Sequence, residues 1–181
     1  GVNQTGRPLP QVLAKRNMHW YEMRDTNVAD IVTTMNPDRR LFFAKFEVPS
    51  FINQRLIGLK STADYPDIDL NHALLNSLLG MFYIEAVGFG RGLGALDINS
   101  TTIRNAYMLN PNIIDRQQRE RILEKFNLLL QRDVYSTERE LSETDRIEFD
   151  HEVLNAYGID QYYSEIKNSL LSMQRMRLGV R

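Results

Sequence analysis

The stretch that decides the fold is DIDLNHALLNSLLGMFYIEAVGFGRGLGALDI, residues 67–98. Apolar residues fill both faces of its first half, and the clearly polar positions between residues 73 and 87 are only Asn76, Ser77 and Glu85. A helix that is apolar nearly all round is buried on most of its sides. We therefore predict one central helix over residues 69–87, enclosed by the rest of the chain.

The two ends of this helix carry different signals. Asp67 or Asp69 can cap its start, and Gly88 can end it in a left-handed turn. Glycines at 88, 90, 92 and 94 then alternate with other residues, among them Arg91. A glycine-rich segment lets the backbone approach another molecule closely, and one arginine within it suits contact with a phosphate or a base edge. The alternative is a plain turn from helix to strand.

Before the central helix the sequence favours strands. Aromatic and β-branched residues predict a strand over residues 41–48 that Pro49 ends, and a second strand over residues 55–59. We expect these two to pair antiparallel and to pack on the central helix. Residues 28–35 are compatible with either a helix or a strand. Two more elements are predicted upstream, a short helix over residues 12–18 and a strand over residues 19–23.

After the glycines the pattern predicts a short strand over residues 95–98 and a short helix over residues 101–104, capped by Asn99 or Ser100. After Pro111 the sequence pattern becomes that of helices. Asp115 and Gln118 form a capping-box pattern. Three amphipathic helices follow, the first ending near Arg132, the second running from Ser142 to Gly158 and the third from Tyr162 to Leu178.

These elements define an α+β fold, in which a small antiparallel or mixed sheet packs on a buried central helix and a helical C-terminal part follows. We expect two parts, an α/β core over residues 1–112 and a helical extension over residues 113–181 that packs on it.

Composition is that of an ordinary globular protein, since 43% of the 181 residues are hydrophobic and 25% are charged. The sequence contains no cysteine, which excludes disulfides and thiolate metal sites and fits the reducing cytoplasm, where we expect the protein to act. The apolar run of the central helix is too short to span a membrane, and Glu85 interrupts it, so no membrane partner is expected. Because the chain begins with glycine instead of methionine, and its first ten residues, GVNQTGRPLP, lack the charged and apolar regions of a signal peptide, we expect part of a longer cytoplasmic protein.

Charge is unevenly distributed although the net charge is only −1. Residues 39–60 contain five basic residues and a single acid, Glu47, whereas residues 133–152 contain eight acids and two arginines. We expect the basic segment to face an anionic partner and the acidic segment to face solvent or a protein partner. The alternative is that both are ordinary solvated surfaces.

A family resemblance rests on several segments in one order. Residues 73–111, ALLNSLLGMFYIEAVGFGRGLGALDINSTTIRNAYMLNP, resemble the C-terminal target-recognition (TaqI-like specificity) domain of N6-adenine DNA methyltransferases from restriction-modification systems. Upstream, WYEMRDTN at residue 20 and LFFAKFEVPSFI at residue 41 are similar to the aromatic entry and paired strands of that family. Downstream, DRIEFDHEVLNAYGI at residue 145 is similar to its helical ending. The resemblance spans residues from about 20 to 159.

The resemblance implies that this chain binds duplex DNA and positions it for a catalytic domain elsewhere in the same protein. That domain is expected to bind S-adenosylmethionine and to methylate a flipped adenine at N6, so DNA methylation belongs to the parent enzyme. No cofactor and no metal are expected in this chain. The catalytic Asn/Asp-Pro-Pro-Tyr/Phe tetrapeptide of the family is missing, because Asn36-Pro37-Asp38-Arg39 and Asn110-Pro111-Asn112-Ile113 both depart from it. The three histidines show no metal-ligand spacing, and we interpret His72 and His151 as structural or solvated.

The predicted DNA contacts are basic and small polar residues near glycines, strand ends and a helix start. Arg91 is the first candidate for a guanine or phosphate contact. The phosphate candidates are Lys60, Arg39 and Arg40. The candidates at the start of the short helix are Asn99, Thr101, Thr102 and Arg104.

Two alternatives to this function remain. The chain could be a stand-alone protein-interaction or regulatory module without DNA binding, using its helical part as a docking surface. It could also be part of a specificity subunit that works without a fused catalytic domain. DNA binding distinguishes the first alternative, and the coding sequence upstream distinguishes the second.

Overall fold

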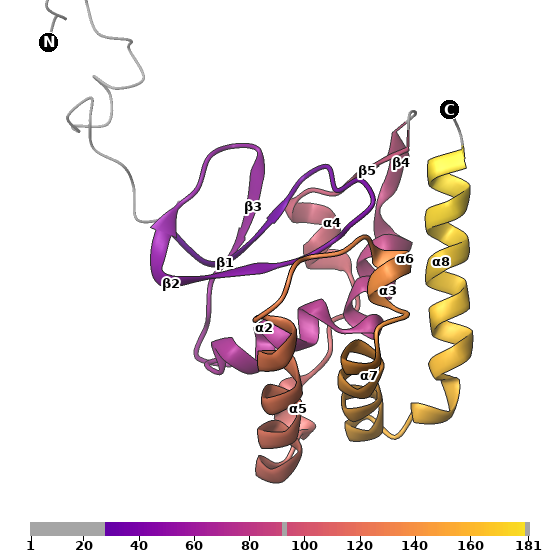
Figure 1. Ribbon diagram of the computed structural model, residues 1–181. Coiled ribbons are helices and arrows are strands. Elements are labelled where there is room, and N and C mark those ends of the chain that lie inside the picture. Colours follow the sequence, from indigo (N-terminus) through magenta and orange to yellow (C-terminus); the bar gives the residue numbers. More distant parts are fainter. Residues whose placement is uncertain (1–27, 92–93, 180–181) are drawn as a thin grey trace, which may run out of the picture.

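The structure is a computed structural model that describes residues 28–91 and 94–179. The helix and strand predicted over residues 12–18 and 19–23 lie outside this part. A small sheet lies at one end of the molecule and helices cover one of its faces and extend away from it (Figure 1). The predicted α+β class, with a helical C-terminal part, is confirmed.

The sheet is built around β1 (Val28–Thr34), with the strand order β2-β1-β3. β2 (Ala44–Phe51) and β3 (Leu56–Leu59) both pair antiparallel with β1. The prediction that the strands of residues 41–60 pair with each other is therefore wrong, because β1 lies between them. β1 is buried along most of its length, so it lacks the alternation that would have distinguished a strand from a helix.

The boundaries of β2 also differ from the prediction. Leu41 and Phe43 are core residues that precede the strand, and the Asn76 side chain binds the backbone N–H and C=O of Phe43 in place of a strand neighbour. Pro49 lies within β2 instead of ending it. It is tolerated there because β2 is an edge strand whose register against β1 shifts between Ala29 and Ile31.

The central helix is two helices, not one. α2 (Ile68–Asn76) and α3 (Leu78–Val87) meet at Ser77, whose backbone is extended at φ −69° and ψ 162°. The Ser77 hydroxyl accepts from the Gly80 N–H, as an N-cap does, and donates to the Leu74 carbonyl. The predicted single helix over residues 69–87 is therefore wrong at Ser77, although its burial and its Asp67 cap are confirmed.

A buried ion pair from a distant helix stabilises this junction. Asp150 accepts the Leu78 N–H at 2.7 Å, and Arg146 donates to the Asn76 carbonyl at 2.7 Å. The two side chains are joined by a 2.7 Å contact between Arg146 Nε and Asp150 Oδ2, and both are almost completely buried. Two of the backbone groups left open by the helix break, the Leu78 N–H and the Asn76 carbonyl, are thus satisfied by one residue pair.

The glycine-rich segment forms a hairpin instead of a loop. β4 (Phe89–Arg91) pairs with β5 (Ala95–Asp97), and β5 matches the strand predicted over residues 95–98. Gly88 does not end α3 in a left-handed turn, since its φ is −73°. A side chain there is excluded for another reason: a Cβ on Gly88 would lie 2.8 Å from Leu96 Cγ. Gly94, just before β5, has the left-handed φ of +83°.

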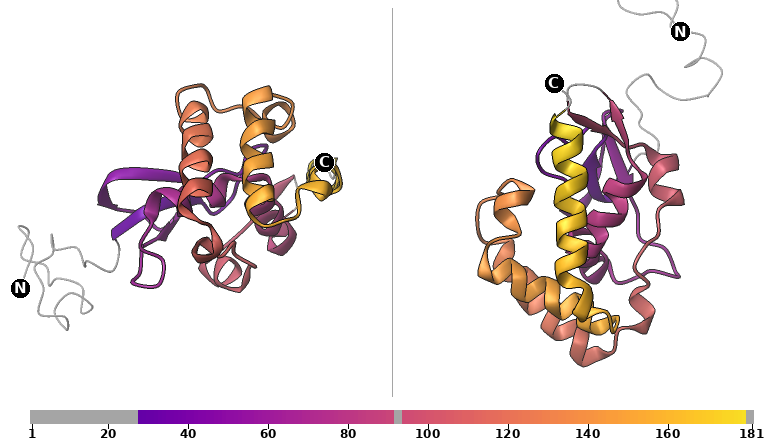
Figure 2. Two further views of the ribbon diagram at one scale, coloured as in Figure 1. Left: turned by 90° about the horizontal axis from the view of Figure 1, so that it is seen from below. Right: turned by 90° about the vertical axis from the view of Figure 1, so that its right-hand side faces the viewer.

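The remaining elements complete the helical part. The short ones are α4 (Ser100–Asn105), η2 (Pro111–Ile113), α6 (Thr137–Glu140) and η3 (Asp160–Tyr162). The long ones are α5 (Arg116–Leu129), α7 (Thr144–Ala156) and α8 (Tyr163–Gly179). α5 and α7 lie side by side, and α8 runs along α3 (Figure 2). The predicted capping box of Asp115 and Gln118 is present.

The hydrophobic core joins both parts of the chain. One cluster unites the sheet, α3 and α8 through residues such as Ile31, Ile84 and Leu170. A second unites α2, α5 and α7 through residues such as Leu74, Phe126 and Phe149.

The acidic segment over residues 133–152 does not lie wholly at the surface, which corrects the expectation that it faces solvent or a partner. Glu140 and Asp150 are buried and paired with arginines. Most of its other acids form ion pairs with neighbouring helices: Glu138 with Arg175, Asp145 with Arg132, Glu148 with Lys125 and Glu152 with Arg121. The acids neutralise arginines inside and between the helices, so their density in sequence does not become a strongly negative face.

Candidate functional site

The lysine and arginine side chains of the helical part, residues 113–179, all bind acceptors within this chain. Lys167 donates to the Leu141 carbonyl. Every other basic residue between 113 and 179 forms an ion pair with a carboxylate: Arg116, Arg119, Arg121, Lys125, Arg132, Arg139, Arg146, Arg175 and Arg177. For Arg132, burial opposes the charge, but the hydrogen bonds that the guanidinium donates to Asp145 and Glu140 outweigh it and raise its pKa.

The cations without an ion pair belong to the first part of the chain. Within residues 28–91 and 94–179, no carboxylate lies within salt-bridge distance of Arg39, Arg55, Lys60 or Arg104. All four residues are exposed. Three of them are predicted DNA contacts, and Arg55 is one that the sequence reasoning missed, although it lies in the basic segment noted above. Unpaired exposed cations are the groups that remain available to phosphates.

The predicted contacts do not form one cluster. Lys60 follows β3, and Arg104 lies on α4. Arg39 and Arg40 instead lie against α6, where the Arg39 carbonyl accepts from Thr137 N–H. Figure 2 (right) places α4 and α6 on opposite sides of α8. The structure thus separates Lys60 and Arg104 from Arg39 and Arg40.

Arg40 is largely buried, with 16% of its side chain exposed. Its Nη1 lies 3.9 Å from Glu140, and neither Nε nor Nη1 has a hydrogen-bond partner in the structure. Burial, aided by the charge of Arg146, lowers the pKa of Arg40 to about 10. Most of this guanidinium is therefore turned inward, which leaves little of it for a phosphate at the surface.

The residues around α4 have distinct roles. The Asn99 side chain accepts from the Thr101 and Thr102 N–H groups, both at 2.9 Å, so it serves as the predicted helix cap. Thr102 is buried at 8% exposure, whereas Thr101 and Arg104 are exposed. Among these four candidates, Thr101 and Arg104 are the ones that present their side chains to an external partner.

Arg91 is the last residue of β4 and pairs with Ala95 across the hairpin. Its side chain lies outside the described part of the structure. The hairpin itself is held by two hydrogen bonds to the chain after β1, from Leu96 N–H to the Pro37 carbonyl and from Ile98 N–H to the Met35 carbonyl. The backbone that carries Arg91 is thus attached to the sheet.

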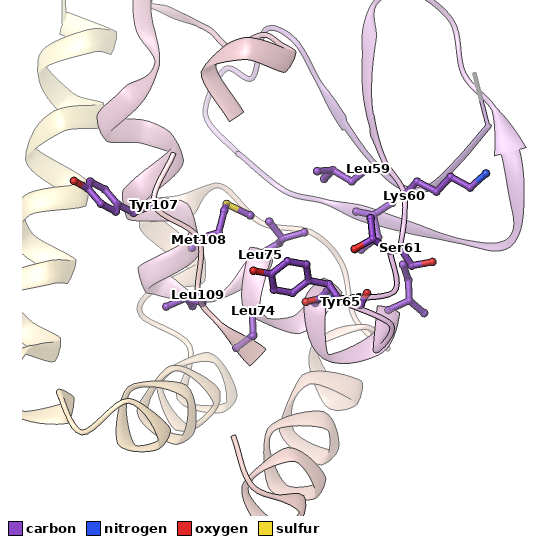
Figure 3. Close-up of a pocket in the computed structure, with 14 residues that line it drawn as sticks. Leu59, Lys60, Ser61, Tyr65, Leu74, Leu75, Tyr107, Met108 and Leu109 are labelled. Atoms are coloured by element: carbon purple, nitrogen blue, oxygen red, sulfur yellow. Dashed lines mark hydrogen bonds between the residues drawn. The ribbon is translucent and has the colours of Figure 1, made fainter. Parts of the chain in front are cut away.

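A cavity of about 250 Å³ opens between the end of β3, α2 and the segment after α4. Its apolar floor includes Leu59, Leu74 and Leu75, and Tyr65 and Met108 lie over that floor (Figure 3). The Lys60 side chain extends away from the floor at one edge, and Tyr107 lies at the opposite edge (Figure 3). We call this cavity, with its rim residues, the tyrosine pocket.

The mouth of the tyrosine pocket is unusually apolar for a surface. Tyr65, Met108 and Tyr107 are 46%, 49% and 78% exposed. Tyr65 is held in place because its N–H donates to the Thr62 carbonyl and its own carbonyl accepts from Asn71. An apolar pocket with a few polar groups is the usual form of a ligand site. The sequence reasoning missed Tyr65, Tyr107 and Met108, since nothing in their local pattern distinguishes an exposed aromatic from a core one.

The histidines have structural surroundings. His72 is buried, donates from Nε2 to the Phe43 carbonyl and packs edge-on against Phe126. Burial lowers the pKa of His72 and keeps the ring neutral. His151 contacts Asp160 and stacks on Tyr163. Over the described residues, no three potential ligands come together in a way that could hold a metal ion.

Comparison with protein-family models, with curated proteins and with solved structures finds no match to this chain. None of the helices between residues 28 and 179 combines the length and apolar character needed to cross a bilayer.

Proposed function

We propose that this chain is the DNA target-recognition domain of a site-specific adenine-N6 DNA methyltransferase and that it binds duplex DNA. The observation that carries the proposal is the division of cations. Those of the helical part are neutralised internally, whereas Arg55, Lys60 and Arg104 on the sheet and α4 have no carboxylate partner in the described structure. The resemblance of residues 73–111 to the TaqI-like specificity domains points to the same partner.

In this function the chain binds the duplex, and a separate domain catalyses the methylation of adenine. Lys60 and Arg104 contact phosphates, which fix the position of the protein on the duplex. Arg91, at the end of β4, contacts a guanine edge or a phosphate. The sequence lacks the catalytic Asn/Asp-Pro-Pro-Tyr/Phe tetrapeptide, so no step of methyl transfer is assigned to this chain, and S-adenosylmethionine is expected in the separate catalytic domain.

Salt-dependent fluorescence anisotropy with a labelled duplex tests the proposal. Lys60→Ala and Arg104→Ala are each expected to weaken binding and to reduce the slope of log K against log salt by about one. Arg116→Ala is the matched control, because Arg116 is 92% exposed but belongs to the neutralised helical part. Absence of duplex binding at low salt, or equal losses in all three variants, contradicts the proposal.

Arg91 is tested in the enzyme that contains this chain. Arg91→Ala is expected to weaken DNA binding and methylation without unfolding the protein. A base contact predicts a loss of roughly 1–3 kcal/mol confined to the cognate sequence, and a phosphate contact predicts a similar loss on every sequence. Identical affinities and salt slopes for both proteins on cognate and scrambled duplexes would remove Arg91 from the interface.

A second candidate function is a protein-interaction module. It is favoured by exposed apolar side chains at the end of α5 and beyond, Leu128, Leu130 and Val134, which are 50%, 54% and 63% exposed. If the chain binds no DNA and associates with another protein, Leu130→Ser and Val134→Ser are expected to weaken that association in analytical ultracentrifugation. The specificity-subunit alternative shares the DNA-binding tests above.

A further inference from the structure

We infer that the tyrosine pocket holds a single unpaired nucleobase of the bound DNA. The inference rests on the proposed function and deepens it, by assigning a ligand to a cavity that phosphate contacts alone leave unexplained. Three properties of the pocket support it: its size, its lining and its charged edge.

The size fits one ring system. At about 250 Å³ the cavity lies just below the usual range of roughly 300–1,000 Å³ for small-molecule sites. Its depth is set by Ile31 of the sheet and by Leu74 and Leu75 of α2, which close its inner end. A planar base enters such a slot, whereas an extended peptide or a drug-sized molecule exceeds it.

The lining provides a stacking surface and hydrogen-bonding groups. Tyr65 lies over the apolar floor with its ring toward the pocket (Figure 3). Ser61, Thr62 and Asn71 add polar groups at the wall on the β3 and α2 side, where the Ser61 hydroxyl donates to Asp30 and the Asn71 amide to the Tyr65 carbonyl, so their oxygens are the groups left to accept from a base. Stacking on an aromatic ring stabilises a bound base and tolerates any base, since every base has a π-face.

The charged edge selects a nucleotide over an uncharged aromatic group. Lys60 is the only charged residue among those that line the cavity in the described structure, and no carboxylate neutralises it. Arg104 lies on α4, the helix that leads into the Tyr107–Leu109 wall. A base in the pocket is attached to a phosphate on each side, so the unpaired cations complement the groups that must accompany it. An aromatic side chain from a protein partner carries no such charge itself.

Three duplexes of one sequence test the inference by anisotropy with the full chain: fully paired, with a one-nucleotide bulge, and with an abasic site at that bulge. The base-containing bulge is expected to bind about tenfold tighter than the abasic one, which is the equivalent of one stacked base. The abasic duplex controls for the added flexibility of a bulge. Equal affinities for the base-containing and the abasic bulge overturn the inference. The proposed function is judged separately, by whether the chain binds the fully paired duplex.

Variants assign the preference to the pocket. Tyr65→Ala is expected to abolish the tenfold preference and to leave binding of the paired duplex unchanged. Met108→Trp, which fills the slot, is expected to do the same without removing the stacking ring. Tyr162→Ala is the control, because Tyr162 is similarly exposed but lies on η3. A preference that survives both pocket variants overturns the inference.

An NMR titration provides a readout that needs no duplex. In methyl-labelled methionine samples, thymidine and adenosine monophosphates are expected to shift the Met108 methyl signal and to leave that of Met176, exposed on α8, unmoved. If nucleotides shift Met108 while no duplex binds, the proposed function fails and the pocket assignment stands. If N-acetyltryptophanamide shifts Met108 and the nucleotides do not, the pocket accepts a protein side chain and the inference is wrong.

Discussion

Replacing Arg146 by methionine tests whether the junction of α2 and α3 depends on the buried ion pair. Methionine keeps much of the volume of the side chain but removes its charge and its donors. Asp150 would keep the Leu78 N–H and lose its 2.7 Å partner, and the Asn76 carbonyl would lose the donor that binds it at 2.7 Å. Removing one member of a buried pair typically costs about 3–5 kcal/mol, so we expect a loss of that size in the free energy of unfolding.

Urea denaturation followed by circular dichroism measures this loss through linear extrapolation. The double variant Arg146→Met/Asp150→Asn is expected to regain about 2 kcal/mol, because an amide at position 150 still accepts from Leu78 N–H and carries no unpaired charge. Arg116→Met is the surface control, since this side chain is 92% exposed and its loss should cost under about 0.5 kcal/mol. A single variant within 1 kcal/mol of the wild type, or a double variant no more stable than the single one, would refute the reasoning.

The pH dependence of the Arg146→Met variant follows from Asp150. Burial raises the pKa of this carboxyl, and the nearby Arg146 charge and the bond from Leu78 oppose the rise. Without Arg146 the pKa of Asp150 in the folded state climbs further above its unfolded value. The folded state then binds the proton more tightly, so the variant gains stability as pH falls from 8 toward 5 and loses it as pH rises. Stability measured at both pH values should show the gap to wild type narrowing at pH 5, and the double variant should show no such narrowing.

Three further substitutions test other parts of the structure. Arg40→Met is expected to be neutral or to stabilise by up to about 2 kcal/mol in urea denaturation, because this buried cation is poorly hydrogen-bonded and Glu140 keeps other arginine partners; a loss above 2 kcal/mol would contradict this. Gly80→Ala should lower the melting temperature although alanine is the better helix former, because its Cβ would lie 2.9 Å from the Leu75 carbonyl oxygen. An unchanged melting temperature would show that the backbone of α2 and α3 shifts to accommodate the methyl group. Arg177→Met should cost about 3–5 kcal/mol by leaving Glu85 without its buried partner, and adding Glu85→Gln should restore part of that loss.

Local hydrogen-bonding signals explain most of what the sequence predicted correctly. The Asn99 cap and the capping box of Asp115 and Gln118 join residues three or fewer positions apart, so their pattern is visible in the sequence itself. The class of fold follows from the same kind of evidence, since helical and strand-like patterns occupy separate parts of the chain. The left-handed turn predicted at Gly88 is absent, and Gly94 is left-handed instead, because the position of a hairpin turn depends on the pairing of its strands.

The failures share a physical cause, which is dependence on distant partners. Ser77 lies within a strongly helical pattern, and the break there is supported by Asp150, 72 positions away along the chain. Glu140 and Asp150 were expected at the surface because their arginine partners cannot be assigned from sequence. The tyrosine pocket was missed for the same reason, since Tyr65 and Tyr107 come together only after α2 and α4 have packed.

Pairing of charges also limits how strongly this chain can hold DNA by itself. A net charge of −1 does not exclude DNA binding, because carboxylates such as Asp67, Glu140 and Glu85 are already neutralised by arginines of the helical part. The cations that remain unpaired in the described structure are Arg39, Arg55, Lys60 and Arg104, and Arg39 lies on the α6 side, away from Lys60 and Arg104. Each phosphate contact contributes about 0.9 to the salt slope on B-form DNA, so three contacts and Arg91 predict a slope of roughly −3 to −4. A measured slope near −8 would require cations that the structure commits to ion pairs, and it would mean that the helical part opens its salt bridges to bind DNA.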